Sequence, residues 1–236
     1  MPPDERFDVP LYSATEVARY LDVPVSTFRT WAHGYVRRQQ GRKPVVGDPI
    51  VTTLQPDAGV SVPFVGLAEA HALAAIRRAG VPLQRIRPAL DVLQRELGIA
   101  HALASKALYT DGAEVLYDYA QSHGDSPEAR SARELVVVRQ GQHVFNDVVD
   151  SYLRRVEFLP GDQWAQLIHL PRYRHADVVV DPRRSFGAPI FANGGVRLET
   201  VLAAFKAGAD IETLTAEYGV PPDDLLDVLR AHTEAA

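Results

Sequence analysis

Hydrogen-bond donors that could contact nucleic acid are concentrated in one stretch near the N-terminus. Arg29–Lys43 holds five cations and no acid. Guanidinium and hydroxyl groups bind backbone phosphates, and a guanidinium can also donate two hydrogen bonds to guanine in the major groove. The stretch is therefore a candidate DNA-binding surface, although the run of charge alone favours the simpler alternative of an exposed basic loop. The candidate DNA-binding side chains are Ser26, Thr27, Arg29, Thr30, His33, Tyr35, Arg37, Arg38, Arg42 and Lys43.

No comparable pattern predicts catalysis or metal binding. The eight histidines are spread along the chain, and the closest pair, His169 and His175 near Asp177, lacks a recognised metal-ligand spacing. The chain has no cysteine, which excludes thiolate nucleophiles and cysteine-based metal sites. No G-x-S-x-G, H-E-x-x-H or P-loop sequence occurs. We therefore expect no enzyme activity, no metal and no cofactor, and a hydrolase with an unrecognised site is the least favoured alternative.

A first short helix must precede the donor-rich stretch. Ser13 followed by Glu16 is the signature of a capping box, which predicts a helix that runs to about Leu21. Asp22-Val23-Pro24 then ends this helix, because proline disfavours a helical conformation in the residue before it.

A second helix is expected to carry the first half of the donors. Ser26 can cap a helix that continues through about His33, and Gly34 can end it. Phe28 and Trp31 lie three residues apart and would anchor this helix to a core. The spacing is that of a helix–turn–helix, in which the second helix presents its side chains to the major groove. Any small packing module of three helices is the alternative.

A hairpin and two further helices complete the predicted N-terminal module. Ile50–Leu54 and Val60–Val62 read as strands joined by the turn Gln55–Gly59, and such a hairpin would act as a wing that grips flanking phosphates. The helices that follow are predicted at Leu67–Ala79, ended by Gly80, and Leu83–Leu97, ended by Gly98.

The middle of the chain reads as mixed, and its end reads as helical. Two strands are predicted around Asp111-Gly112 within Leu108–Tyr119, because Asp-Gly is a favoured hairpin turn. The other middle elements are expected to be a polar loop at Ser122–Ser131, a strand at Leu135–Val138, a helix at Val144–Leu153, and strands at Val156–Phe158 and Ala165–Leu170. The C-terminal elements are expected to be a strand at Asp177–Val180, an irregular stretch at Asp181–Gly195, and helices at Leu198–Lys206, Ile211–Tyr218 (capped by Asp210) and Pro222–His232.

Composition places the chain among ordinary globular proteins. Of its 236 residues, 46% are hydrophobic and 23% are charged, and the formal net charge of -5 excludes a strongly basic protein. The charge is uneven, since residues 1–98 carry 12 Lys/Arg against 10 Asp/Glu and residues 99–236 carry 13 against 20. No apolar run approaches the roughly 20 residues that cross a bilayer, and Met1–Glu5 does not resemble a signal peptide. A cytoplasmic protein without a membrane association is expected.

The N-terminal part resembles MerR-type winged-helix regulators. Tyr12–Trp31, with the sequence YSATEVARYLDVPVSTFRTW, is similar to their first two helices, and Val65–Ile86 is similar to their third and fourth. The resemblance implies DNA binding. Three features depart from the pattern: the wing region Tyr35–Val62 is long, Gly98 ends the helix with which that family dimerises, and the metal-sensing cysteines of some members are absent.

The C-terminal part resembles a second family, the domain-of-unknown-function family 433. Val178–Ile190, with the sequence VVVDPRRSFGAPI, is similar to its opening, and the later parts of its pattern are matched by Gly195–Arg197, Ala207-Gly208 and Ala216–Tyr218. Leu135–Phe158 is also similar to the segment that precedes this domain in larger members. Members of this family often accompany a PIN-like nuclease as its antitoxin, so the combination resembles a large VapB-type antitoxin.

These observations lead to one prediction of fold and function. We expect a mostly α, α+β protein with a winged helix-turn-helix at residues 1–98, a mixed linking and dimerisation region at 99–176, and a three-helix domain at 177–236. The resemblance implies an antitoxin that neutralises a PIN-like toxin through its C-terminal part and represses its own operon as a homodimer on operator DNA. The alternative is a MerR-like transcriptional regulator that responds to a small ligand held by the middle region.

Overall fold

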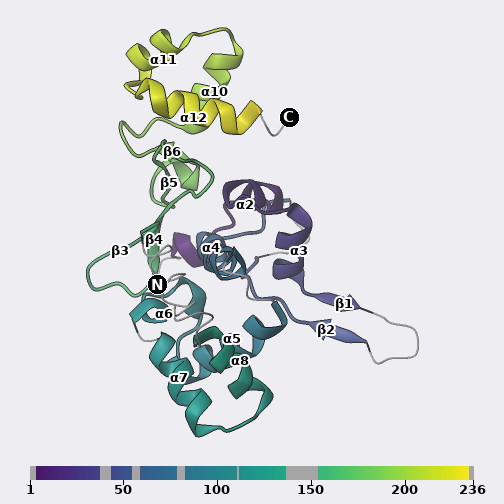
Figure 1. Ribbon diagram of the computed structural model, residues 1–236. Helices are drawn as coiled ribbons and strands as arrows, with labels where there is room; N and C mark the ends of the chain where they lie inside the picture. Colours follow the sequence, from purple (N-terminus) through teal and green to yellow (C-terminus); the bar gives the residue numbers. More distant parts are fainter. Residues whose placement is uncertain are drawn as a thin grey trace.

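The computed structural model describes residues 4–37, 44–54, 59–78, 83–110, 112–136 and 154–233 of the chain. It confirms a mostly helical α+β fold with a helix–turn–helix near the N-terminus, a small antiparallel sheet, and helices at the C-terminus (Figure 1). Within these ranges no helix is long and apolar enough to cross a membrane.

The helix–turn–helix begins with a capping box, as predicted. The short α1 (Glu5–Asp8) is followed by α2 (Ala14–Tyr20). The Ser13 amide donates to Glu16 Oε2 at 2.8 Å, and the Glu16 amide donates to Ser13 Oγ at 3.2 Å. These reciprocal hydrogen bonds satisfy two amides that have no partner within the helix, and so they fix where α2 starts.

The second helix, α3 (Val25–His33), starts one residue before the predicted cap. Ser26 is therefore not the N-cap: Pro24 holds that position, and no side chain caps the helix. The Pro24 carbonyl accepts hydrogen bonds from the amides of Thr27 at 2.9 Å and Phe28 at 3.1 Å, which places Ser26 inside the first turn. Gly34 ends α3 as predicted, with a φ of 73°.

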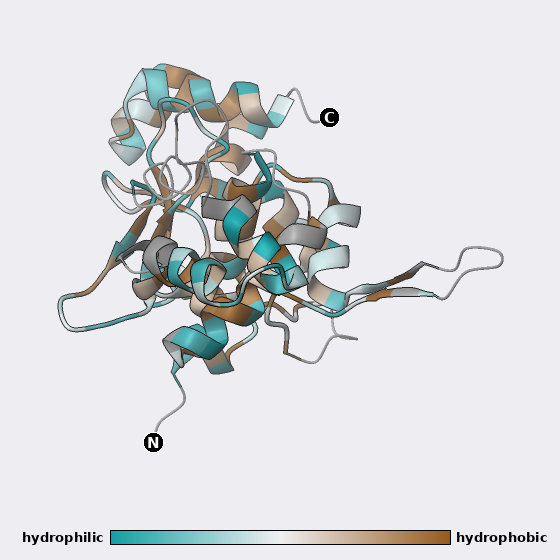
Figure 2. Ribbon diagram, turned by 60° about the horizontal axis from the view of Figure 1, so that its bottom comes forward, coloured by the Kyte–Doolittle hydropathy of each residue, from teal (hydrophilic) through white to brown (hydrophobic). Residues whose placement is uncertain are grey.

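The hairpin follows α3 directly, so its predicted place was wrong. β1 (Tyr35–Arg37) pairs antiparallel with β2 (Val45–Gly47), and the pair projects from the helical body (Figures 1 and 2). The predicted strand at 50–54 does not form, because the amides of Ile50 and Val51 both donate to the Trp31 carbonyl, at 2.8 and 3.2 Å. Of the second predicted strand, Val62 forms only an isolated bridge to Tyr12, and residues 55–58 of the predicted turn lie outside the described ranges.

The two long helices after the hairpin confirm the prediction. These are α4 (Phe64–Arg78) and α5 (Leu83–Leu97). Gly98, with a φ of 64°, follows α5, whereas Gly80 lies outside the described residues. Most of α4 is buried, so it forms the centre of the hydrophobic core.

The segments predicted as strands on either side of Asp111 are helical, and Asp111 itself lies outside the described residues. α6 (Ala107–Thr110) and α7 (Gly112–Ser122) replace the hairpin, and α8 (Pro127–Val136) replaces the second half of the polar loop and the start of the strand predicted at 135–138. Leu116 and Ala120 lie one helical turn apart, and both are buried in the core. Packing of this helical face outweighs the local turn signal of Asp-Gly. The helix predicted at 144–153 lies outside the described residues.

The sheet contains four antiparallel strands in the order in which they occur along the chain. Its strands are β3 (Val156–Phe158), β4 (Ala165–His169), β5 (Val178–Val180) and β6 (Ile190–Phe191). The first three confirm the prediction, and β6 lies within the stretch expected to be irregular. A 3-10 turn, η2 (Ser185–Gly187), precedes β6.

Three helices at the C-terminus confirm the prediction. They are α10 (Leu198–Lys206), α11 (Ile211–Tyr218) and α12 (Pro222–Thr233). Asp210 caps α11, because its Oδ1 accepts a hydrogen bond from the Thr213 amide at 2.8 Å. Each helix contributes buried side chains to the common core: Val201 from α10, Leu214 from α11, and Leu225 and Val228 from α12.

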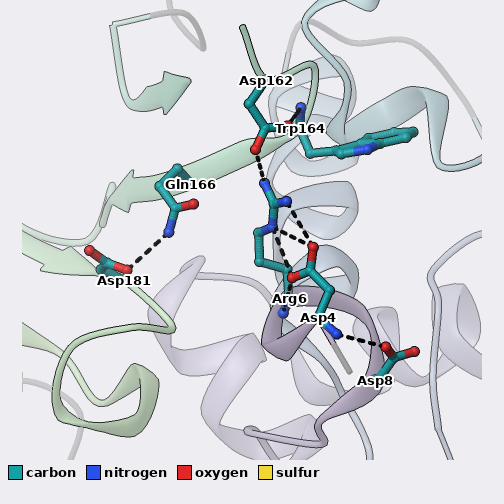
Figure 3. A network of polar contacts seen from close by, with 7 residues as sticks. All are labelled: Asp4, Arg6, Asp8, Asp162, Trp164, Gln166 and Asp181. Carbon is teal, nitrogen blue, oxygen red and sulfur yellow. Dashed lines mark hydrogen bonds and ion pairs between the residues drawn. The ribbon is translucent and has the colours of Figure 1, made fainter. Parts of the chain in front are cut away.

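The N-terminal segment binds to the loop before β4, far along the sequence. Arg6 forms ion pairs with Asp4 at 2.8 Å and with Asp162 at 2.6 Å (Figure 3). The neighbouring Phe7 packs edge-on against Trp164, with 5.5 Å between the ring centroids. These contacts join α1 to the sheet.

Candidate nucleic-acid interface

One face of α3 carries exposed polar side chains, and the other face is buried. Ser26, Arg29 and His33 are exposed, and their spacing places them on the same side of the helix. Phe28 and Trp31 are 0% and 2% exposed and anchor the opposite side in the core. The exposed face therefore offers a hydroxyl, a guanidinium and an imidazole to an outside partner.

The other three described candidates are half-buried. Thr30 Oγ1 donates a hydrogen bond to the Ser26 carbonyl at 2.9 Å, so this hydroxyl already has a partner within the helix. Thr27 lies beside the exposed face, and Tyr35 begins β1 at the base of the hairpin. The three positions border the exposed face of α3.

The hairpin extends the same surface beyond α3. The exposed fractions of Val36 and Val46 are 60% and 63%, so the described strands have little cover (Figure 2). Arg37 is the last residue of β1, and only its backbone is described. Arg38, Arg42 and Lys43 lie outside the described residues. Their predicted contact with DNA stays a prediction.

Glycine is required where α3 turns into the hairpin. Gly34 has a φ of 73° and a ψ of -166°, a combination that is essentially restricted to glycine. A Cβ at this position would lie 2.2 Å from the Gly47 carbonyl oxygen on β2. The two backbones can thus approach only because Gly34 has no side chain, and this approach sets the direction of the hairpin relative to α3.

Arg87 of α5 supports the base of the hairpin, which the sequence did not reveal. Its guanidinium lies over the Tyr35 ring, 5.4 Å from the centroid, and its Nη1 donates to the Asp48 carbonyl. These contacts hold the ends of both strands against α5. No sequence spacing indicates them, because Arg87 and Tyr35 are brought together only by the fold.

A buried carboxylate on α4 fixes the segment that follows the hairpin. Glu69 is 4% exposed and accepts hydrogen bonds from the Thr52 amide at 2.6 Å and from His101 Nδ1 at 2.8 Å. The hydrogen bond to Glu69 raises the pKa of His101 against the opposing effect of burial. Glu69 is the only acid in α4, and its nearest neighbours in the sequence are apolar, which is a sequence signal of such a buried partner.

The histidine considered as a metal ligand forms a cross-strand ion pair instead. His169 on β4 contacts Asp177 through Nδ1 at 2.6 Å and Glu157 through Nε2 at 3.0 Å. Burial lowers the pKa of His169, but the two hydrogen bonds outweigh this effect and raise it overall. Because both ring nitrogens face carboxylates, the charged form of the ring links three neighbouring segments of the sheet.

Comparison with known proteins identifies both ends of the chain. Residues 10–90 match a family described as "Putative DNA-binding HTH domain", and residues 178–230 match "Protein of unknown function (DUF433)". The chain is 50% identical to the "Putative antitoxin VapB45" of Mycobacterium tuberculosis over 229 residues, which cover 96% of this chain and 95% of the relative. The chain belongs to the VapB45 antitoxin family.

Two further matches extend over nearly the whole length of the chain. The crystal structure of Rv2018 from Mycobacterium tuberculosis has 46% sequence identity and a TM-score of 0.77, and the match covers 95% of this chain and 99% of the other. The uncharacterised Mycobacterium tuberculosis protein Rv2308 is 24% identical, and the match covers 94% of this chain and 90% of Rv2308. The fold of Rv2018 therefore matches that of this chain over nearly its whole length, including the regions of both family matches.

Proposed function

We propose that this VapB45 relative represses its own operon and neutralises a PIN-like toxin. The observation that carries the DNA-binding part is the exposed polar face of α3 followed directly by the projecting hairpin. Operator DNA and a toxin made in the same cell would both require the protein to act in the cytoplasm.

On DNA, α3 is proposed to enter the major groove in the MerR manner. Arg29 would reach base edges from the middle of the exposed face, while Ser26 and His33 would contact the strands on either side. The hairpin would then lie along the adjacent phosphates with Arg37 and the cations that follow it in the sequence. Two copies would bind the two halves of a symmetric operator, which is why we propose a homodimer.

The C-terminal segment is the proposed contact for the toxin. Residues 186–236 contain three Lys/Arg against eight Asp/Glu, so binding of this segment as a whole to the polyanionic backbone of nucleic acid is electrostatically disfavoured. The same segment exposes large apolar side chains: the exposed fractions of Phe186, Phe205 and Leu226 are 85%, 40% and 38%. Exposed aromatic and aliphatic side chains on an acidic surface are typical of protein partners rather than of nucleic acid.

A salt titration tests the role of the hairpin. Replacing Arg37 and Arg38 by Ala should weaken binding to any DNA and reduce the slope of log affinity against log salt by about one for each phosphate that is no longer neutralised. Binding is measured by fluorescence anisotropy with a fragment from the chain's own upstream region. Arg130→Ala, an exposed arginine on α8, is the matched control and should leave the slope unchanged. Equal slopes for all three proteins would remove the hairpin from the DNA interface.

Rescue of growth tests the toxin interface. Co-expression of the neighbouring toxin with the Phe205→Ala, Leu226→Ala double variant should restore growth less than the wild-type chain does, because two exposed apolar side chains are removed. Tyr117→Ala on α7 is the control. Tyr117 is, like Phe205, an exposed aromatic residue, with an exposed fraction of 49%, but it lies outside the C-terminal helices. Full rescue by the double variant, together with failure of Tyr117→Ala, would move the toxin interface to the middle region.

A further inference from the structure

A pocket lies between the helix–turn–helix and the C-terminal helices. It has a volume of about 360 Å³, within the range of roughly 300 to 1,000 Å³ typical of small-molecule sites. Tyr20 comes from α2, Lys206 from α10 and His232 from α12, while Tyr173 lies between β4 and β5. The pocket is therefore built by elements from both ends of the sequence.

Aromatic side chains form one wall of this interdomain pocket. Tyr20 and Tyr173 are 6% and 4% exposed, so their rings are held firmly by the core. Tyr173 stacks on the His232 ring, and its hydroxyl is hydrogen-bonded to His232 Nε2 at 3.0 Å. Rigid aromatic walls favour a planar, apolar ligand body.

A buried hydroxyl in the same wall has no partner among the described residues. Tyr12 is 1% exposed, and its hydroxyl oxygen makes no hydrogen bond there. It lies against the backbone of Gly187, where a Cβ would come within 2.5 Å of it. Burial holds the pKa of Tyr12 well above its usual range, so the group remains a donor. Buried hydroxyls are nearly always satisfied, so an unpaired donor beside this pocket is unusual.

Cations at the rim give the pocket a positive character. Arg19, Arg197 and Lys206 line it, opposed by two acids, Glu16 and Glu199. The Glu16 carboxylate is occupied by the amide and hydroxyl of Ser13, at 2.8 and 2.7 Å.

The state of His232 agrees with this positive character. Burial first, and then the nearby Arg172, Arg19 and Lys206, lower the pKa of His232 to about 4. Its ring is therefore neutral at pH 7, and the surrounding cations are left to attract an anionic ligand.

We propose that this interdomain pocket binds a small aromatic anion, with a planar ring beside Tyr20 and Tyr173 and a carboxylate or phosphate group held by Arg197 and Lys206. The α10 helix begins at Leu198 in the same wall, and its positive N-terminal dipole adds to the attraction. Such a ligand would touch α2 and the C-terminal helices together. The site goes beyond the proposed antitoxin function and does not depend on it.

Calorimetric titration of the full chain with four probes tests the site. AMP and salicylate each combine a ring with an anionic group, whereas adenosine lacks the anion and inorganic phosphate lacks the ring. We expect AMP or salicylate to bind one per chain and at least tenfold more tightly than either control; binding of AMP identifies a nucleotide site, and binding of salicylate an aromatic carboxylate site. No binding of either at millimolar concentration, or phosphate binding as tightly as AMP, would overturn the proposal.

Substitutions of lining residues test whether the probe binds in this pocket. The Arg197→Gln, Lys206→Gln double variant should bind the successful probe at least tenfold more weakly, and Ala203→Trp, at an exposed lining position on α10, should block the pocket. Lys106→Gln, at an exposed lysine that does not line the pocket, should bind as the wild type does. Circular dichroism confirms that each variant is folded. Unchanged affinity in either a folded double variant or a folded Ala203→Trp variant would contradict the assignment.

Discussion

Individual buried residues determine how the stability of this protein depends on pH. His71 on α4 is 3% exposed, and burial, followed by the nearby Arg155 and Arg78, lowers its pKa to about 3. The unfolded chain binds a proton to this histidine near its ordinary pKa of 6.5, whereas the folded chain does not. Its contribution to stability is therefore present above pH 6.5 and declines as the pH falls toward the folded pKa.

This difference predicts a measurable loss of stability in mild acid. Between pH 6.5 and pH 5, His71 should reduce the free energy of unfolding by about 2 kcal/mol, since one pKa unit corresponds to about 1.4 kcal/mol. Urea unfolding at the two pH values should show a smaller drop for His71→Leu than for the wild type. His123→Gln, at an exposed position, is the control. Parallel losses in His71→Leu and the wild type would show that another group causes the acid sensitivity.

Elements with local end signals were predicted well, and elements defined by distant partners were not. Ser13 and Glu16 define the start of α2 within four residues, and Gly34 ends α3 through its own backbone. The strand predicted at 50–54 failed because its amides bind the Trp31 carbonyl, which no local pattern reports. The strands predicted on either side of Asp111 failed for the same kind of reason, since burial of Leu116 favours the helix α7.

The junction between α3 and the hairpin gives a prediction for these elements. Gly34→Ala should destabilise the fold by roughly 1–3 kcal/mol and weaken DNA binding, because alanine disfavours this backbone conformation and its Cβ would meet Gly47. Thermal unfolding and anisotropy titrations measure the two effects. Gly59→Ala is the matched control, since a Cβ there has no atom within 4 Å and the φ of Gly59 is not positive. Wild-type stability and DNA affinity in Gly34→Ala would show that the hairpin does not depend on this close approach.

At the scale of the whole molecule, the distribution of charge can be predicted from the sequence, whereas contacts between distant segments cannot. The excess of cations before residue 98 was visible in composition and agrees with the match of residues 10–90 to a DNA-binding HTH family. The ion pair of Arg6 with Asp162 and the packing of Tyr12 against Gly187 could not be predicted, because their partners are more than a hundred residues apart. The division at residues 98 and 176 stays a prediction.

The central claim for the whole chain is that it recognises its own operator through α3. An anisotropy titration should compare a fragment of its own upstream region with shuffled DNA of the same composition at one salt concentration. We expect the wild-type chain to bind the upstream fragment roughly 10³-fold or more tightly than the shuffled one. Arg29→Ala should weaken binding to the upstream fragment by roughly 1–3 kcal/mol and binding to the shuffled DNA only a little, because the hydrogen bonds it removes are to a base edge. Equal affinity of the wild-type chain for the two DNAs, or equal weakening on both in Arg29→Ala, would contradict operator recognition by α3.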